Sequence, residues 1–311
     1  MAPSAVAVDV STSLTGPQVA DVRSSLDRTG RADGVVPLSE AARLRLRPDT
    51  SDAEHLIASG PDEAGGVGYA QIEPGPAGEA DTKVEAELFV DPQWRRRGVG
   101  TALGRAVLKA AGERFGQRTA VSMWAHGDLP GSAELAAHLG LVRTRDLWQL
   151  RLQLGEPLPE PVVPADLVIR AFRPGADDAA WLHLNATAFA SHPEQGSWTA
   201  HDLELRLQEP WFDPAGFFLA ERNGRLIGFH WTKVHSDEVP PLGEVYVLGV
   251  DPAEAGHGLG SLLTTVGLRY LQARGLRTVL LYVEASNPAA LTVYERQGFE
   301  RYAVDVSYRT V

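Results

Sequence analysis

The sequence predicts an α/β protein composed of two tandem domains, each with helices packed on a mixed β-sheet. Short apolar runs that suit strands alternate with amphipathic segments that suit helices. A Val-Asp-Pro motif at residues 90–92 recurs at residues 250–252, and Gly98 and Gly100 also recur as glycines 160 positions later. A period of this length is too long for a solenoid repeat, so it indicates a duplicated domain.

A proline-rich segment separates the two copies. Residues 154–167, LGEPLPEPVVPADL, contain four prolines and no helical periodicity, which is typical of an extended linker. We therefore expect a first domain over residues 1–154, a linker over residues 155–167 and a second domain over residues 168–311. The chain has 311 residues, 44% of them apolar and 22% charged, which suits two globular domains.

The composition argues against several classes of protein. No window approaches roughly eighteen consecutive apolar residues, and the N-terminus lacks the features of a secretory signal, so we expect a cytoplasmic protein with no membrane partner. A net charge of −11 argues against a nucleic-acid partner. The absence of cysteine excludes thiolate metal sites, and His230 and His235 fall on opposite faces of one predicted strand, so we expect no metal. We expect a monomer.

In the first half, a glycine loop follows a predicted strand. The apolar run at residues 87–90 suits the strand, and the segment after Gly100 suits an amphipathic helix. Between them Arg95, Gly98 and Gly100 form the pattern Arg-x-x-Gly-x-Gly. Backbone N–H groups at a helix N-terminus bind anions, so a pyrophosphate is a suitable ligand. One such loop is equally well read as a glycine-rich turn beside solvated arginines, but two copies at the same junction favour the anion site.

Two other phosphate-binding loops do not match. Neither copy continues with the Gly-Lys-Ser/Thr of a P-loop. Residues 98–103 (GVGTAL) and 258–263 (GLGSLL) both lack the third glycine of a dinucleotide-binding fingerprint.

The second half predicts its elements in a clear order, and the first half follows that order with weaker hairpin signals. A strand at residues 168–172 precedes a helix that ends near residue 189. Two strands meet at Asn223-Gly224, a dipeptide that favours a type I′ hairpin turn. After these come a buried strand at 243–250, a helix with Leu259, Leu262, Leu263, Val266 and Tyr270 on one face, a strand at 278–284, a helix with Asn287 as N-cap and Pro288 at N1, and a strand at 302–309.

Both glycine loops resemble the pyrophosphate loop of the GNAT superfamily of N-acetyltransferases, Gln/Arg-x-x-Gly-x-Gly/Ala. The first loop matches fully, whereas the second has Ala255 where the family has Gln or Arg. In the second half the resemblance extends to SNPAALTVYERQGF, residues 286–299. It implies two tandem GNAT domains, each with one acetyl-CoA site held mainly by backbone amides. The residues implied to bind acetyl-CoA are Leu88, Phe89, Val90, Arg95, Arg96, Arg97, Gly98, Val99, Gly100, Thr101, Leu248, Gly249, Val250, Ala255, Gly256, His257, Gly258, Leu259, Gly260, Ser261, Asn287, Pro288, Ala289, Ala290, Leu291 and Thr292.

The resemblance also implies direct acetyl transfer in the second domain, with one base and one acid. An α-amino group titrates at about 8, so a base need only assist a partly neutral amine. Glu244 matches the family's general base, acting through a water, and Tyr294 matches the acid that protonates the departing thiolate. A backbone N–H of residues 248–250, where the strand separates from its neighbour in this fold, would stabilise the oxyanion. Without the family match these two side chains are an ordinary strand glutamate and a core tyrosine.

A narrower resemblance indicates the acetyl acceptor. The segments SHPEQGSW (191–198), GFHWTKVH (228–235) and GEVYVLGVDP (243–252) resemble tandem-domain GNAT members that acetylate the cysteinyl amine of cysteinyl-glucosaminyl-inositol. Two alternatives stay open: a GNAT enzyme for another amine, such as a peptide N-terminus or an aminoglycoside, and a non-enzymatic acyl-CoA sensor. By the resemblance, the substrate-binding residues are Glu40, Glu194, Lys233, Glu244 and Tyr282.

The first domain is predicted to bind acetyl-CoA without catalysing transfer. Alignment of the two halves places Ala136 where the second domain has Tyr294, and it places Val84 where the second domain has Glu244. Neither alanine nor valine transfers a proton. Glutamates at positions 85 and 87 lie close by, so a base at a shifted position stays open.

Overall fold

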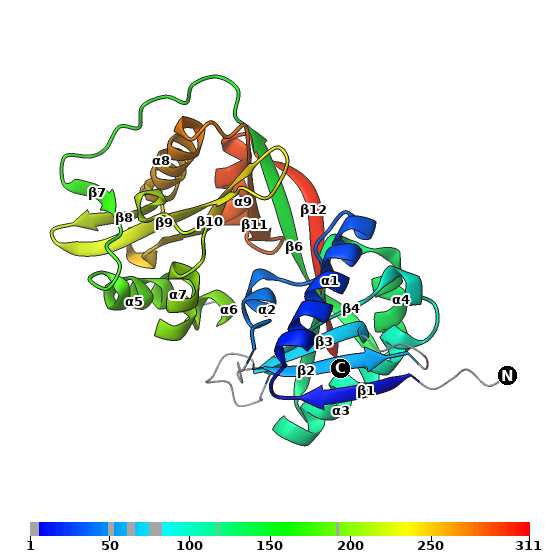
Figure 1. Ribbon diagram of the computed structural model, residues 1–311. Coiled ribbons are helices and arrows are strands. Elements are labelled where there is room, and N and C mark those ends of the chain that lie inside the picture. The colour runs from blue at the N-terminus through cyan, green and yellow to red at the C-terminus, as the bar shows by residue number, and fades with distance from the viewer. Residues whose placement is uncertain (1–5, 49–52, 61–65, 75–82, 117, 191–192) are drawn as a thin grey trace. The chain divides into compact units, whose positions relative to one another are not determined.

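The computed structural model describes residues 6–48, 53–60, 66–74, 83–116, 118–190 and 193–311 (Figure 1). The chain forms two compact units: unit 1 is Met1–Asp146 with Val304–Val311, and unit 2 is Leu147–Ala303. The strand β6 (Leu141–Gln153) begins in unit 1 and ends in unit 2, and β12 (Glu300–Thr310) does the reverse. The units therefore depart from the expected ranges 1–154 and 168–311 in these two strands. Strand pairing joins residues far apart in the sequence, which local patterns do not reveal.

Unit 1 is a mixed sheet covered by helices. Each pair of neighbouring strands from β1 to β12 is antiparallel except β4 and β5, which are parallel. One core cluster joins α3 to the sheet through Leu103 and Val107, and another joins α1 to Tyr69 and Phe89. The strands, in sheet order, are β1 (Ala7–Ser11), β2 (Glu54–Ser59), β3 (Gly66–Pro74), β4 (Lys83–Val90), β5 (Ala120–Ala125) and β12. The helices are α1 (Gly16–Asp33), α2 (Glu40–Leu44), α3 (Val99–Phe115) and α4 (Pro130–His138).

Unit 2 repeats this plan. Its parallel pair is β10 and β11, and the other neighbours are antiparallel. Helix α8 packs on one face of the sheet, while α5 covers an aromatic core that includes Trp181 and Trp231 on the other (Figure 1). The strands, in sheet order, are β7 (Leu167–Ala171), β8 (Phe217–Arg222), β9 (Arg225–His235), β10 (Leu242–Val250), β11 (Thr278–Glu284) and β6. The helices are α5 (Asp178–Ala188), α6 (Pro193–Gly196), α7 (Ala200–Leu207), α8 (Leu259–Ala273) and α9 (Pro288–Arg296).

The local signals of the second half are confirmed. Asn223 and Gly224 have φ of 53° and 75° between β8 and β9, as a type I′ turn requires. Asn287 caps α9 by accepting a hydrogen bond from the N–H of Ala290 at 3.1 Å, and Pro288 is the first residue of the helix. These features depend on neighbouring residues alone, which is why the sequence predicts them.

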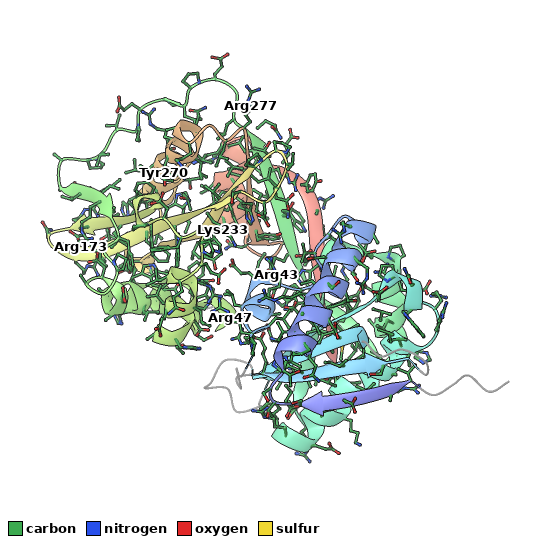
Figure 2. The ribbon with its side chains drawn as sticks, viewed as in Figure 1. Arg43, Arg47, Arg173, Lys233, Tyr270 and Arg277 are labelled. Carbon is green, nitrogen blue, oxygen red and sulfur yellow. The ribbon has the colours of Figure 1, made fainter. Side chains whose placement is uncertain are left out.

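The buried face of α8 differs in part from the expected one. Leu259 and Leu263 are buried as expected, but the face continues through Gly267, Leu268 and Leu271 and leaves the other expected residues half-buried. A Cβ atom on Gly267 would lie 2.1 Å from the His230 ring, so this glycine admits the histidine between helix and sheet. Tyr270, labelled in Figure 2, was expected in the apolar face. Its hydroxyl donates to the carboxylate of Asp213 at 2.5 Å.

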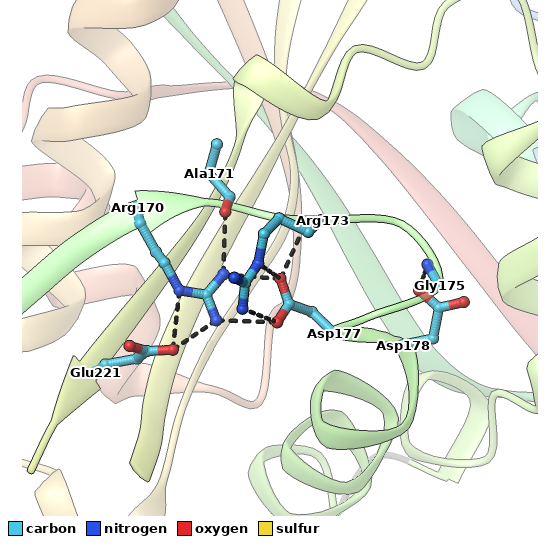
Figure 3. A network of polar contacts seen from close by, with 7 residues as sticks. All are labelled: Arg170, Ala171, Arg173, Gly175, Asp177, Asp178 and Glu221. Atoms are coloured by element: carbon cyan, nitrogen blue, oxygen red, sulfur yellow. Dashed lines mark hydrogen bonds and ion pairs between the residues drawn. The ribbon is translucent and has the colours of Figure 1, made fainter. Parts of the chain in front are cut away.

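An ion network fixes the start of α5 to the edge of the unit 2 sheet (Figure 3). The guanidinium of Arg170 on β7 donates to both carboxylate oxygens of Asp177, at 2.7 and 2.9 Å, and also to Glu221 on β8. The hydrogen bonds from Arg170 outweigh the effect of burial and lower the pKa of Asp177. The network thus ties two strands to the helix that covers them.

Residues 154–166, most of the expected linker, contain neither helix nor strand, and residues 156–160 contact the end of α8. The N–H of Leu158 donates to Gln272 at 3.0 Å, and Arg269 donates to the carbonyl oxygen of Leu158 at 2.5 Å. Among the described residues, no helix is long and apolar enough to cross a membrane.

Candidate active site

The two glycine loops have the same construction. After the last strand residue, Asp91 in unit 1 and Asp251 in unit 2 each cap a short 3-10 turn. Their Oδ1 atoms accept from the N–H groups of Gln93 and Ala253, at 3.2 and 2.9 Å. The repeated Val-Asp-Pro motif therefore forms the turn that connects each strand to its glycine loop.

Each loop ends at a position whose backbone conformation favours glycine. Gly98 and Gly258 are the N-caps of α3 and α8, with φ of 84° and 79°, in the left-handed region. The described residues offer no side-chain cap to either helix and no atom within 4 Å of a Cβ built on either glycine. The first-turn N–H groups are thus open to a ligand, which is the arrangement that an anionic pyrophosphate needs.

The arginines of the first loop have protein partners. Arg95 forms two hydrogen bonds of 2.7 Å with Asp33 and a third, of 3.2 Å, with the carbonyl oxygen of Val90. Arg96 pairs with Glu134 at 2.6 Å, and Arg97 stacks over Trp94 at 4.9 Å. Arg95 therefore shapes the loop through the backbone of Val90, a role that the motif did not reveal. In the second loop Ala255 makes no such bond, and its neighbour Glu254 pairs with Arg222 and Arg225 instead.

The parallel strands separate beside each loop. In the described register β10 pairs with β11 from Gly243 to Val245 and not beyond, whereas residues 248–250 remain paired with β9. A bulge between Val245 and Val247 marks the point of separation. The edge of β10 that faces β11 is thus free of strand pairing where the acetyl group was expected. In unit 1 the pairing of β4 with β5 ends at Glu87 and leaves residues 88–90 in the same situation.

Glu244 and Lys233, both expected in the site, are neighbours. They lie directly opposite each other on β10 and β9, and both are buried. The Nε2–H of His235 donates to Oε2 of Glu244 at 2.7 Å. The ammonium group of Lys233 lies 4.3 Å from the ring centroid of Trp211 and 5.2 Å from that of Tyr246 (Figure 2). Carboxylate, ammonium and imidazole groups therefore gather on the face of β9 and β10 opposite to α8.

Tyr294 lies in the second turn of α9, with its ring against Phe299 at 5.7 Å between centroids. It is 92% buried in the core cluster that includes Leu268 and Val283, being 8% exposed. Burial raises the pKa of Tyr294 to about 12, so its hydroxyl is protonated at neutral pH. Tyr294 is thus a core residue whose hydroxyl carries a proton at neutral pH.

The remaining expected residues are placed as follows. Tyr282 on β11 is half-exposed, and its hydroxyl accepts from Gln149 at 2.8 Å. Glu40 is the first residue of α2 in unit 1. Glu194 lies on α6, but its side chain falls outside the described residues, as do Ser191 and His192 of the same segment. Residues 287–292, which were expected to bind acetyl-CoA, form the N-cap and first turns of α9.

Comparisons with known proteins support one family. The model of the acetyltransferase (GNAT) family matches residues 32–141 and 180–299. A mycothiol acetyltransferase of Geodermatophilus obscurus is 54% identical, covering 94% of each chain. Another of Thermomonospora curvata is 51% identical, covering 96% of this chain and 95% of the relative. The chain belongs to the mycothiol acetyltransferase family.

The fold agrees with that membership. A tandem GNAT protein from the clavulanic acid biosynthesis pathway superposes with a TM-score of 0.72 at 20% identity, covering 98% of each chain. Members of the family are acetyltransferases, so this chain is an acyltransferase with two GNAT regions, and GNAT enzymes generally use acetyl-CoA as the acetyl donor. In the part of the chain that the structure describes, no three His, Cys, Asp or Glu side chains gather in a way that would hold a metal ion.

The alignment of Val84 with Glu244 is wrong, because the bulge in β10 shifts the register by one residue. Glu244 lies opposite Lys233 on β9. In unit 1 the strand position that matches Lys233 is Glu73, which lies opposite Glu85. Glu85 is therefore the counterpart of Glu244, while Val84 faces the α3 core. The alignment of Ala136 with Tyr294 agrees with the structure, since each is the seventh residue of its helix, α4 and α9.

Sequence reasoning missed a charged cluster at the end of the parallel strands in unit 1. His126 lies 2.9 Å from Oδ2 of Asp305 through Nδ1 and 3.4 Å from Oε2 of Glu87 through Nε2. The same Glu87 oxygen accepts from the backbone N–H of Ser39, the N-cap of α2, at 2.6 Å. Asp305 comes from β12, far along the chain, so no local pattern signals this cluster.

Proposed function

We propose that unit 2 transfers the acetyl group of acetyl-CoA to the cysteinyl amine of cysteinyl-glucosaminyl-inositol, in one direct step, in the cytoplasm. The observation that carries the proposal is the buried carboxylate of Glu244 beside Lys233, at the point where β10 and β11 separate. The relatives named as mycothiol acetyltransferases, similar over nearly the whole chain, support the choice of acceptor.

The residues present fit acetyl-CoA. The open N–H groups at the start of α8 would hold the pyrophosphate, and the first turns of α9 would hold the pantetheine arm. The acetyl-CoA supplies the activated acetyl group as a thioester. A backbone N–H of residues 248–250 then hydrogen-bonds to the acetyl oxygen, because no strand occupies that edge of β10 in the described register.

Two side chains move protons in this scheme. Glu244 accepts a proton from the substrate amine through a water, since its carboxylate is buried at the separating strands. Tyr294 donates a proton to the sulfur that leaves. Its high pKa keeps the hydroxyl protonated until that donation, because burial disfavours the phenolate.

The acceptor is a polyol with one ammonium group, and the expected pocket residues have matching chemistry. Lys233 and Tyr282 donate hydrogen bonds to hydroxyl groups, while Glu194 accepts from the ammonium and hydroxyl groups. Aromatic rings of Trp211 and Tyr246 hold the ammonium of Lys233, which restricts its orientation.

Unit 1, in this proposal, binds acetyl-CoA without catalysing transfer. Its loop has the same open helix N-terminus, at Gly98. Ala136 stands in the place of the proton donor Tyr294 and is buried in the core. Glu85 occupies the position that corresponds to the base Glu244. The chemical difference between the two units is therefore that unit 1 lacks the acid.

One assay tests the proposed function. The full chain is incubated with acetyl-CoA, and release of free CoA is followed with cysteinyl-glucosaminyl-inositol, with cysteine and with a peptide amine. We expect kcat/KM to be highest for cysteinyl-glucosaminyl-inositol. Equal or higher values for the peptide amine would show a different acceptor, and no release with any amine would leave only acyl-CoA binding.

A further inference from the structure

The carboxylate of Glu244 is hydrogen-bonded to His235, a residue to which the sequence analysis assigned no role in the site. His235 donates from Nε2 to Oε2 of Glu244 at 2.7 Å. We infer that His235 is a positioning residue that orients the base Glu244, an inference that rests on the proposed function.

The strand register brings the two residues together. On β9, His235 and Lys233 are two positions apart and so lie on the same face. Glu244 lies opposite Lys233, and its neighbour Leu242 lies opposite His235. His235 and Glu244 are therefore diagonal neighbours across an antiparallel pair, within reach of long side chains. This contact forms just before the bulge at which β10 separates from β11.

The direction of the hydrogen bond has a chemical consequence. An ionised carboxylate only accepts hydrogen bonds, so the imidazole must carry its proton on Nε2. Oε2 of Glu244 then accepts the hydrogen bond from His235. Because this bond does not use Oε1, Oε1 is the oxygen that accepts a proton from the substrate side. A hydrogen bond from a fixed ring also prevents rotation of the carboxylate, which a base needs in order to act at a defined distance.

Burial makes the partner necessary. The Glu244 side chain is 8% exposed and that of His235 is 23% exposed. A nearly buried carboxylate loses much of its hydration, and a donated hydrogen bond offsets that loss. His235 is partly open to solvent, so the imidazole keeps its own hydration while it holds the buried group. The nearby cation of Lys233 faces the rings of Trp211 and Tyr246.

The test compares two substitutions of His235 in the full chain. His235→Leu removes the donor, and we expect kcat to fall roughly 10- to 100-fold, the effect of losing a hydrogen bond to a charged group, with KM for acetyl-CoA unchanged. His235→Gln keeps an Nε2 amide donor at a similar reach, so we expect it to recover most of the loss. The matched control is His183→Leu, an exposed histidine of α5 in the same unit, which should leave kcat unchanged. Wild-type turnover in His235→Leu, or equal losses in the Leu and Gln variants, would overturn the inference.

A double-mutant cycle separates positioning from a general effect on the fold. In a Glu244→Gln background, His235→Leu should cause little further loss, because a positioning residue acts through the group it positions. The same fold-loss in both backgrounds would contradict the inference. Wild-type turnover in the Glu244→Gln single variant would contradict the proposed function. Wild-type turnover in His235→Leu, with turnover lost in Glu244→Gln, would contradict the positioning role alone.

A spectroscopic measurement keeps the inference testable if the leucine variant does not fold. Nitrogen NMR of the histidine-labelled wild-type chain, assigned with His235→Gln, reports which ring nitrogen carries the proton. We expect the Nε2–H form for His235, with a shift that changes in Glu244→Gln. A ring protonated on Nδ1 alone would overturn the inference.

Discussion

Glu244 and Tyr294, the two proposed proton-transfer residues, have opposite surroundings. Glu244 has the polar partner His235 and lies across from Lys233. Tyr294 packs on Phe299 within an apolar cluster, and burial raises its pKa to about 12. Apolar contacts favour the neutral phenol of Tyr294 over the phenolate. The proposed base and the proposed acid of unit 2 therefore lie in different environments, one polar and one apolar.

For Tyr294→Phe we expect kcat to fall by roughly 10²- to 10⁴-fold, the scale of one acid–base group. The substitution keeps the ring packed on Phe299 and removes only the hydroxyl, so KM for acetyl-CoA should change little. Steady-state kinetics on the full chain give both values. The matched control is Tyr302→Phe, at an exposed tyrosine of the same unit. Near wild-type turnover in Tyr294→Phe would end the assignment of the acid.

For Glu244→Gln we expect the loss in kcat/KM to be largest at acidic pH. The substrate amine is mostly protonated there, so removal of its proton depends most on the base. At high pH the amine is already neutral and activity should partly recover. A pH profile of wild type, variant and the exposed control Glu300→Gln measures this. A loss of the same size at every pH would instead indicate that the carboxylate binds substrate.

At the scale of single elements, the two strand–loop–helix junctions are equal in backbone but unequal in side chains. Gly98 and Gly258 have nearly the same φ, 84° and 79°. The first loop adds the bond from Arg95 to Val90, and the second has Ala255 there. Since the open N–H groups are common to both, we expect both junctions to bind acetyl-CoA.

Matched substitutions of the two N-cap glycines test this division of labour. Valine at either position must adopt a positive φ and adds a Cβ where the ligand approaches. Isothermal titration with acetyl-CoA should show two sites in the wild-type chain and one in each variant. Gly258→Val should lose turnover, whereas Gly98→Val should retain most of it. A folded Gly98→Val chain without turnover would show that unit 1 takes part in the chemistry.

The charged cluster of unit 1 predicts a loss of stability at alkaline pH. Burial opposes charge on His126, but the hydrogen bonds and charges of Asp305 and Glu87 outweigh it and raise its pKa to about 10. Because the pKa of His126 is higher in the folded state, its protonated form stabilises that state. The stabilisation is complete at pH values below the ordinary histidine pKa of 6.5, and it disappears as the pH rises through about 10. Burial opposes charge on Glu87, but the hydrogen bonds from His126 and Ser39 outweigh it and lower the pKa of Glu87, so the contribution of Glu87 is lost on acidification.

Asp305→Asn isolates this contribution. At pH 7.5 we expect the free energy of unfolding to fall by about 3 kcal/mol, the cost of breaking a buried ion pair. Above the pKa of His126 the difference from wild type should shrink, because the wild-type pair is then lost as well. Urea unfolding of both chains at several pH values measures it. A difference that does not depend on pH would assign the effect to packing.

At the scale of the whole molecule, two strands cross between the compact units. Residues 147–153 of β6 pair with β11 in unit 2, and residues 306–309 of β12 pair with β5 in unit 1. Val306 and Tyr308 belong to the unit 1 core, whereas Leu150 belongs to a core of unit 2. Each half of the sequence thus completes the sheet of the other unit.

Removal of residues 304–311 should therefore destabilise unit 1, although they end the second half of the sequence. Hydrogen exchange should show lost protection in β5, the partner of β12, and retained protection in β8 and β9. Deletion of Val311 alone, which is fully exposed, is the control. Loss of protection confined to unit 2 would contradict this reading of the strand exchange.

The sequence by itself determined the duplication, the two glycine loops, the hairpin turn at Asn223-Gly224 and the cap of α9 at Asn287. Each follows from the conformational preferences of adjacent residues, and together they located the two loops that we propose to bind acetyl-CoA. Burial of Glu244 and Tyr294 in the unit expected to be catalytic agrees with that reading, but their chemical roles stay proposals.

Only the tertiary structure decided which residues meet across the sheet. The bulge in β10 made Glu85, not Val84, the counterpart of Glu244. Strand exchange brought Asp305 to His126, and the register of β9 brought His235 to Glu244. Strand pairing, a one-residue bulge and a buried ion pair join positions far apart in the chain, and their energies depend on burial, which no local pattern contains.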